Sequence, residues 1–324
     1  MKKDSRRFLF SQHDAPILVV RGGAIGDFIL TLPVLSALRL NFPNARIELL
    51  ARARTAPLAI AGVLADNWRD LEGREVSGLF VPKGEITPSL REWLGRFALV
   101  ISYVPDPEGV LLTNLSRFCP ARVFSGPSRP DETQSQHATE QFLEPLRAIG
   151  IKEFALVPRL GGSLRCESVR NRSAGLTLAM HPGSGGEKKN WSEARWSELL
   201  AGLSHETDWN FLLVGGEAER GKLARLAGQL PSSRFDLAEN LPLTELAMRL
   251  HSCDFFLGHD SGITHLASAL GLPGLVLWGD TNATVWRPLG GRMEILREEG
   301  GLVALSVEKV FRELRRSAHF APMA

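Results

Sequence analysis

The 324-residue sequence has few of the features that mark several common functional classes. It contains one Tyr and only 7% aromatic residues, and its formal net charge is +2. Scarce aromatic side chains argue against the base-stacking platforms of proteins that bind single-stranded nucleic acid. A near-neutral charge argues against a surface built to track a phosphate backbone. We therefore expect no nucleic-acid partner.

Cysteine and long apolar stretches are also scarce. Cys119, Cys166 and Cys253 are odd in number, far apart and in no metal-ligand spacing, which favours structural thiols in a reducing, cytoplasmic compartment. No apolar stretch reaches the roughly 18 residues of a membrane-spanning helix. The basic start, residues 1–7, is too short for a signal peptide, and a disordered leader is favoured over contact with an anionic membrane surface.

Apolar runs and amphipathic segments alternate along the chain, separated by turns that use many of the 31 glycines. Predicted strands lie at 17–20, 47–50, 97–103, 176–180, 211–214, near Phe235, at 255–257 and at 275–278. Predicted helices lie at 28–40, 54–65, 87–96, 108–117, 134–150, 193–204, 218–230, 243–250, 263–270 and 307–315, the last with a basic exposed side.

This alternation predicts an α/β protein with two doubly wound, Rossmann-like domains that face a cleft. We expect one domain at 1–160, a hinge at 161–174 where the pattern lapses, a second domain at 175–305, and a C-terminal helix and tail at 306–324. The hinge predicts that the domains close when a ligand binds.

Residues 255–267 are the most informative stretch. An apolar strand is followed by Asp260, Ser261 and Gly262, and then by an amphipathic helix that contains Ile263 and His265. A strand, a tight turn and a helix start direct free backbone N–H groups at one point, where a phosphate binds well. An ordinary turn whose Asp and Ser cap the helix, with a packed structural His265, would look similar.

Three other strand ends carry polar groups. Asp27 begins a helix, where a carboxylate stabilises the helix or acts as a general base. The glycine-rich segment 181–191 could wrap an anion or be a solvated loop, and the glutamates in 215–220 could bind a ribose diol or only favour a helix start. The first loop, 21–27, has Ala24 in place of a glycine and no Lys-Ser/Thr pair, so it supports neither a dinucleotide nor a nucleoside-triphosphate site. Three of the four polar turns lie in the second domain, so we expect the domain at 175–305 to bind a nucleotide sugar and the domain at 1–160 to bind an acceptor.

At these residues the chain resembles the heptosyltransferases, glycosyltransferase family nine, which are inverting enzymes with the GT-B fold. The resemblance runs from about residue 17 to 288. It is carried by Gly26-Asp27 with Thr31-Leu32-Pro33, by segments 182–191 and 258–267, and by 271–279 with Trp286-x-Pro288. It implies transfer of a heptose from an ADP-heptose donor to an anionic glycolipid acceptor of the lipopolysaccharide inner core. It also implies a cytoplasmic location, with contact at the inner membrane left open.

The resemblance implies a role for each matching residue. Asp27 would be the catalytic base and Lys189 would stabilise the diphosphate leaving group. The remaining nucleotide-sugar contacts would be Ser184, Glu219, Leu241, Asp260, Ser261, Gly262, Ile263 and His265. Because a helix start and a lysine can stabilise the leaving group, no cofactor is required; a divalent metal is left open, although no site implies one.

Two departures concern the substrates. Gly23-Ala24 replaces hydroxyl residues found in some relatives, and Asn282-Ala283 interrupts a proline-containing loop near the sugar. Arg52, Arg54, Arg117 and Arg122 are candidates for an anionic acceptor or are solvated surface arginines. The alternatives are transfer of another sugar or to another acceptor, a non-catalytic sugar-nucleotide-binding protein, and a hydrolase or epimerase on the same scaffold. The presence of both Asp27 and Lys189 argues against a binding module.

Overall fold

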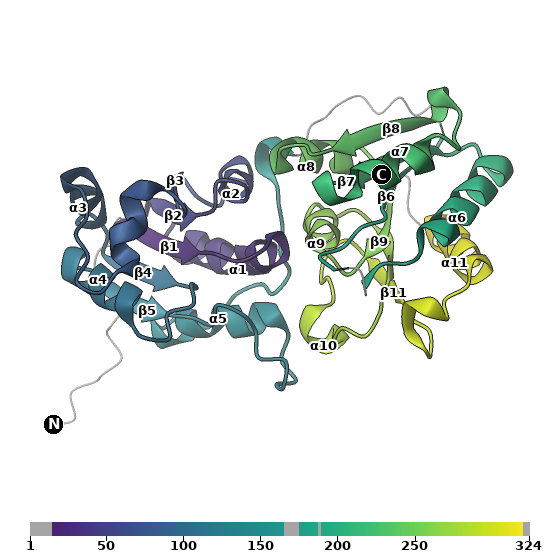
Figure 1. Cartoon of the computed structure of the whole chain (residues 1–324). Helices are drawn as coiled ribbons and strands as arrows, with labels where there is room; N and C mark the ends of the chain where they lie inside the picture. The colour runs from purple at the N-terminus through teal and green to yellow at the C-terminus, as the bar shows by residue number, and fades with distance from the viewer. Residues whose placement is uncertain (1–14, 165–174, 187–188, 320–324) are drawn as a thin grey trace. The chain divides into compact units, whose positions relative to one another are not determined.

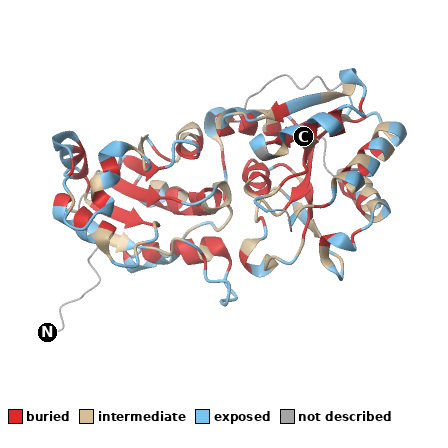
Figure 2. Cartoon of the chain, in the orientation of Figure 1, coloured by how far each residue is buried: buried red, intermediate tan, exposed pale blue. Residues whose placement is uncertain are grey.

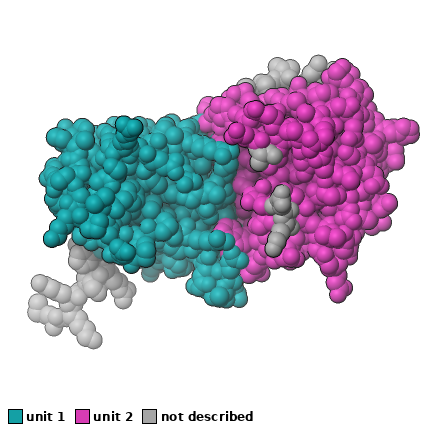
Figure 3. Space-filling model, in the orientation of Figure 1, with its two compact units in different colours: residues 1–158 teal, residues 159–324 magenta. Residues whose placement is uncertain are grey.

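The computed structural model describes residues 15–164, 175–186 and 189–319. The chain divides into two compact units, unit 1 at residues 1–158 and unit 2 at residues 159–324 (Figures 1 and 3). The division falls two residues before the domain boundary expected from the sequence. Of the expected hinge, residues 165–174 lie outside the described residues, so closure stays a prediction.

Unit 1 is built on a sheet of five parallel strands in the order β3-β2-β1-β4-β5. Central strand β1 pairs in register with both neighbours, so that Ile17 lies opposite Ile47 on one side and Leu99 on the other. All residues of β1, β2 and β4 are buried, as expected for strands covered on both faces. The strands are β1 (Ile17–Arg21), β2 (Ile47–Ala51), β3 (Asn67–Asp70), β4 (Leu99–Ser102) and β5 (Arg122–Ser125).

Helices connect the strands of unit 1, so all strands run in the same direction and their carboxyl ends lie on one side of the sheet. The helices are α1 (Ile25–Asn41), α2 (Ala56–Ala61), the 3-10 helix η1 (Arg74–Phe80), α3 (Pro88–Leu94), α4 (Val110–Phe118) and α5 (Ala138–Ala148).

Unit 2 repeats the plan with six parallel strands in the order β11-β10-β9-β6-β7-β8. The order reverses between β6 and β9, which lie side by side in the middle of the sheet. The strands are β6 (Thr177–His181), β7 (Asn210–Gly215), β8 (Phe235–Glu239), β9 (Phe255–His259), β10 (Gly274–Leu277) and β11 (Met293–Leu296).

Helices again connect the strands, and they expose their outer faces while the central strands are buried (Figure 2). The α-helices are α6 (Glu193–Glu206), α7 (Arg220–Ala227), α8 (Leu243–His251), α9 (Gly262–Ala269), α10 (Ala283–Trp286) and α11 (Val307–His319). The 3-10 helices are η2 (Gly162–Leu164), η5 (Glu217–Glu219), η6 (Ser232–Arg234) and η7 (Gly301–Val303). The predicted class, two doubly wound parallel α/β domains, is confirmed.

Sequence patterns missed three strands, and each is at the edge of a sheet. β3 and β5 border the first sheet, β11 borders the second, and none of them has a fully buried residue run. An edge strand is covered less completely than a central one, so its sequence lacks the continuous apolar run that identifies a buried strand. The helix expected at 134–150 begins only at Ala138, where His137 caps it.

Helix α11 belongs to the core of unit 2. Val310 and Leu314 are fully buried and pack in the same apolar cluster as Leu199 and Leu203 of α6. The expected basic exposed side is largely neutralised, because Lys309, Arg315 and Arg316 form ion pairs with Glu298, Glu206 and Glu294. The helix is therefore a structural element with a charge-balanced surface. Among the described helices, none is long and apolar enough to span a bilayer.

We predict that Leu314→Ala lowers the free energy of unfolding by about 2–5 kcal/mol, because it leaves a cavity under α11. Urea denaturation measures the change. Arg312→Ala, on the exposed side of the same helix, is the matched control and should change stability by no more than about 0.5 kcal/mol. Equal effects of the two substitutions would contradict the assignment of α11 to the core.

Candidate active site

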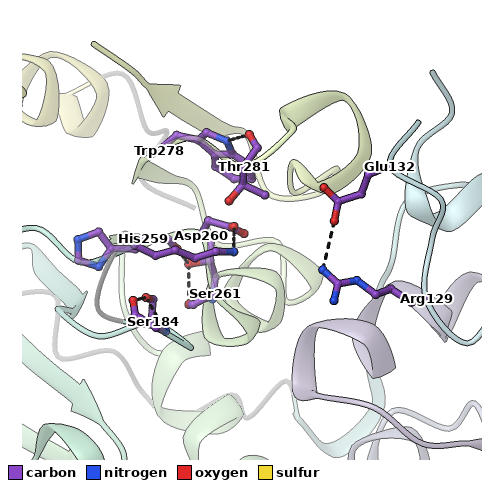
Figure 4. A network of polar contacts seen from close by, with 12 residues as sticks. Arg129, Glu132, Ser184, His259, Asp260, Ser261, Trp278 and Thr281 are labelled. Atoms are coloured by element: carbon purple, nitrogen blue, oxygen red, sulfur yellow. Dashed lines mark hydrogen bonds and ion pairs between the residues drawn. The ribbon is translucent and has the colours of Figure 1, made fainter. Parts of the chain in front are cut away.

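The candidate nucleotide site lies at the carboxyl end of the second sheet. Ligands of open α/β proteins bind where the strand order reverses, which here is between β6 and β9. The segment that starts at Pro182 follows β6, and Asp260 follows β9. Figure 4 shows Ser184, Asp260 and Ser261 in this region. The topology thus brings together two segments that are about 80 positions apart in the chain.

Ser261 caps helix α9 and so organises the predicted phosphate-binding turn. Its Oγ accepts a hydrogen bond from the amide of Thr264 at 3.3 Å and lies 3.3 Å from His181 Nδ1. The Thr264 hydroxyl donates in turn to the carbonyl of His259. The first two amides of the helix, those of Gly262 and Ile263, belong to the turn that has no intrahelical acceptor. They are the N–H groups that an anion could use.

Lys189 and Asp260 form an ion pair beside this helix start. The distance from Lys189 Nζ to Asp260 Oδ2 is 2.6 Å, and a dashed line at Asp260 marks it in Figure 4. The lysine side chain is 46% exposed whereas that of Asp260 is 10% exposed. The ammonium group is therefore held in position by a nearly buried carboxylate while it remains accessible to an anion.

Two buried histidines lie at the ends of the two central strands. Burial lowers the pKa of His259 to about 3, and burial together with the nearby Lys222 ammonium lowers the pKa of His181 to about 4. His259 Nε2 accepts a hydrogen bond from the amide of Trp191 at 2.8 Å, so the ring proton is assigned to Nδ1, which faces the Gly183 carbonyl at 3.4 Å. Both rings are neutral at physiological pH. Sequence reasoning did not select either residue.

Glu219 and Leu241 follow β7 and β8 along the same edge. Glu219 Oε2 accepts a hydrogen bond from the Gly216 amide at 2.8 Å, which is the helix-start role that the sequence left open. A Cβ at Gly183 would come within 2.4 Å of Glu219 Oε1, so the glycine lets the two loops approach closely. Leu241 is half-buried beyond the end of β8. His265 is buried one turn inside α9, as a packed structural histidine would be.

The departure at Asn282-Ala283 has a local structural role. The Asn282 side chain accepts a hydrogen bond from the Thr284 amide at 3.0 Å and caps the short helix α10. Just before it, Trp278 Nε1 donates to the carbonyl of Thr281 at 2.7 Å. The loop after β10 is thus ordered by its own polar contacts.

In unit 1, Asp27 lies at the carboxyl end of β1, in the first turn of α1. Its Oδ2 accepts a hydrogen bond from the Ala24 amide at 2.9 Å, and its side chain is 20% exposed. Gly23 has φ +88°, and a Cβ there would lie 2.8 Å from Asp27 Oδ2. Asp27 therefore stabilises the helix start and still presents carboxylate oxygen to solvent.

The buried Arg21 side chain holds the backbone of this turn through hydrogen bonds. Its buried guanidinium donates to the carbonyls of Tyr103, Ser128 and Asp27 at 3.1, 2.8 and 3.0 Å. It also lies 4.6 Å from the centre of the Phe142 ring. Burial lowers the pKa of Arg21 to about 10 although the Asp27 carboxylate opposes the shift. One cation thus connects the ends of β1 and β4 to the helix that carries Asp27. A lone arginine at the end of an apolar strand was the only signal of this role in the sequence.

Of the four candidate acceptor arginines, two follow the carboxyl end of a strand in the first sheet and two lie near the start of a strand. Arg52 follows β2 at the same edge as Asp27, where it donates to the Gly23 carbonyl and pairs with Glu72, and Arg54 is exposed nearby in the sequence. Arg122 begins β5 and Arg117 lies near the end of α4, which leads to that strand start. Starts of parallel strands lie at the opposite edge from their ends. Arg117 and Arg122 are therefore not at the Asp27 edge.

Metal ligands do not cluster in the described parts of the chain: residues 15–164, 175–186 and 189–319 contain no group of three His, Cys, Asp or Glu side chains placed to share an ion. Cys119 and Cys253 are buried cysteines whose Sγ atoms donate to the carbonyls of Phe97 and Arg249, and Cys166 lies outside the described residues.

Comparison with known proteins places this geometry in a family context. A model of glycosyltransferase family 9 (heptosyltransferase) matches residues 134–312. The chain is 28% identical over 286 residues to lipopolysaccharide heptosyltransferase 1 of Pseudomonas aeruginosa, covering 82% of this chain and 79% of that protein. The structure of Escherichia coli ADP-heptose lipopolysaccharide heptosyltransferase II superposes with a TM-score of 0.76 at 18% identity, covering 94% of this chain and 98% of the other. The E. coli heptosyltransferase WaaC with ADP gives a TM-score of 0.72 at 18% identity, covering 93% and 99%.

The two buried histidines predict an acid-sensitive fold. Because their folded-state pKa values lie below the ordinary value of 6.5, the unfolded chain binds protons first as the pH falls. The free energy of unfolding is therefore unaffected by the two histidines above pH 6.5. Below that pH it falls toward pH 4 by about 1.4 kcal/mol per pH unit for each histidine. Urea denaturation at pH 7, 6 and 5 measures the slope. His181→Asn should reduce it, and an unchanged slope in that variant would contradict the assignment.

Proposed function

The chain belongs to glycosyltransferase family 9, the heptosyltransferases, and we propose that it transfers a heptose from an ADP-heptose donor. The acceptor would be an anionic glycolipid of the lipopolysaccharide inner core, and the configuration at the anomeric carbon would be inverted. The observation that carries the proposal is the Lys189–Asp260 ion pair beside the capped start of α9. The names of the relatives support an ADP-heptose donor and a lipopolysaccharide acceptor. The reaction would take place at the cytoplasmic face of the inner membrane, where a soluble donor meets a lipid-linked acceptor.

Unit 2 would hold the donor. The amides of Gly262 and Ile263 and the Lys189 ammonium would bind the diphosphate, whose negative charge grows as the bond to the sugar breaks. Ser184 would add a phosphate contact, Glu219 would accept hydrogen bonds from the ribose, and Leu241 would contact adenine. In this scheme the positive groups all come from the protein, so no metal ion is required.

Asp27 in unit 1 would act as the base. Its carboxylate takes the proton of an acceptor hydroxyl while that oxygen attacks the anomeric carbon. The new glycosidic bond forms as the bond between that carbon and the diphosphate oxygen breaks, and ADP leaves with the electron pair. Arg21 would hold the backbone of Asp27, and the Ala24 amide would hold its carboxylate, for which Gly23 leaves room.

A panel of ADP, GDP, UDP and NAD tests the donor site by thermal shift. We expect selective stabilisation by ADP, about 2.7 kcal/mol at a hundredfold excess over Kd, or roughly 5–10 °C. Lys189→Ala should reduce the ADP shift. A shift with UDP or GDP alone would overturn the proposed donor, and no shift with any nucleotide would contradict a nucleotide site at this edge.

Asp27→Asn tests the base. The amide oxygen can still accept the Ala24 hydrogen bond, so we expect an intact fold and an unchanged ADP shift, but turnover slower by a factor of about 10²–10⁴. ADP release from ADP-heptose in the presence of acceptor measures it. Asp70→Asn is the matched control, since Asp70 ends β3 at the same edge and its Oδ1 accepts the amides of Ala53 and Glu72. Equal activity of the two variants would remove Asp27 as the base.

A further inference from the structure

Gly185 and Gly186, which lie between Ser184 and Lys189, have little packing of their own. A Cβ at Gly185 or Gly186 would meet no atom within 4 Å, and both residues are exposed. The Lys189 side chain is about half exposed and pairs with Asp260. The Lys189 amide and the Ser184 hydroxyl both donate to the Gly186 carbonyl, at 3.0 and 2.9 Å, and the residues before and after attach this turn to the sheet.

His259 holds both ends. Its ring connects the Gly183 carbonyl, which precedes Ser184, to the Trp191 amide, which lies two residues beyond Lys189. Each contact is to backbone, so each restrains the path of the chain. The residue that follows His259 is Asp260, the partner of Lys189. The same short stretch thus fixes the chain on both sides of the lysine and supplies the carboxylate that receives it.

The ring is itself anchored in the core. His259 has no exposed surface and lies edge-on to Trp196 at 5.4 Å between ring centres. Trp191 contacts Trp196 in the same manner at 5.6 Å, and its Nε1 donates to the carbonyl of Leu305 at 3.0 Å. A fully buried ring cannot touch a ligand, so any effect of His259 on the donor must pass through the backbone that it holds.

We propose that His259 is a positioning residue for the donor diphosphate: it holds the Gly183 and Trp191 backbone against the end of β9 and thereby places Lys189 beside the start of α9. This inference rests on the proposed function, because it concerns the same phosphate site. His259 acts as a hydrogen-bond acceptor toward Trp191 and as a donor toward Gly183, a combination that an apolar side chain cannot reproduce.

Substitutions separate this role from simple core packing. His259→Leu fills much of the space but leaves the Trp191 amide without its acceptor. His259→Gln carries an oxygen four bonds from Cα, the same number that separates Nε2 from Cα in histidine, and so can restore that bond. Leu226→Ala is the control, since Leu226 is buried in the core of unit 2 within α7 and contributes no atom to the phosphate site.

Calorimetric titration of the full chain with ADP and with inorganic pyrophosphate, well below the melting temperature of each variant, is the test. We expect His259→Leu to weaken both ligands about tenfold, since a buried donor without a partner costs enough to open the contact. We expect His259→Gln to recover most of the affinity and Leu226→Ala to retain all of it. Wild-type affinity in His259→Leu, or an equal loss in Leu226→Ala, would overturn the inference.

A double-mutant cycle with Lys189→Ala tests whether the effect passes through the lysine. If His259 positions Lys189, His259→Leu should cause little further loss in the Lys189→Ala background. Independent, additive losses would overturn the inference while leaving the proposed function in place. A wild-type chain that binds neither ADP nor pyrophosphate would overturn the proposed function itself.

Discussion

Parallel pairing of every strand is the constraint on which the rest of this structure depends. Each parallel pair needs a helical crossover. The carboxyl ends of all strands in a sheet therefore lie on one side, and their starts lie on the opposite side. In unit 2 the order reverses between β6 and β9, so the segments that follow these two strands are neighbours at the carboxyl ends of the strands. Lys189, Asp260 and the start of α9 meet there because of this topology, although they come from separate parts of the chain.

Buried polar groups make these edges rigid in both units. In unit 1 the Arg21 guanidinium connects three backbone carbonyls beneath Asp27. In unit 2 the neutral ring of His259 accepts a hydrogen bond from the Trp191 amide, and that of His181 contacts the Ser261 hydroxyl, close to the Lys189–Asp260 pair. A rearrangement that breaks one of these hydrogen bonds would leave a buried polar atom unpaired, which favours a single geometry at each place. The candidate site residues Asp27 and Lys189 are thus accessible, while Arg21 and His259 beside them are buried.

Much of the fold could be predicted from the sequence, and the failures have a common cause. Central strands such as β1 and β9 are buried on both faces and show continuous apolar runs. The edge strands β3, β5 and β11 are only partly covered and show no such run. The basic pattern of α11 was visible, but its partners Glu206, Glu294 and Glu298 are distant in sequence or follow no helical spacing. Their pairing could be seen only after the helix was packed.

The sequence by itself determined the alternation of strands and helices, the turns that carry Asp27 and Ser261, and the family resemblance, because these depend on residues that are neighbours along the chain. Only the tertiary structure decided that Arg117 and Arg122 lie at the edge away from Asp27, that Lys189 pairs with Asp260, and that His259 connects Gly183 to Trp191. The contacts of Lys189 and His259 join residues that are 68 to 76 positions apart. They follow from strand order and burial, which no local pattern encodes.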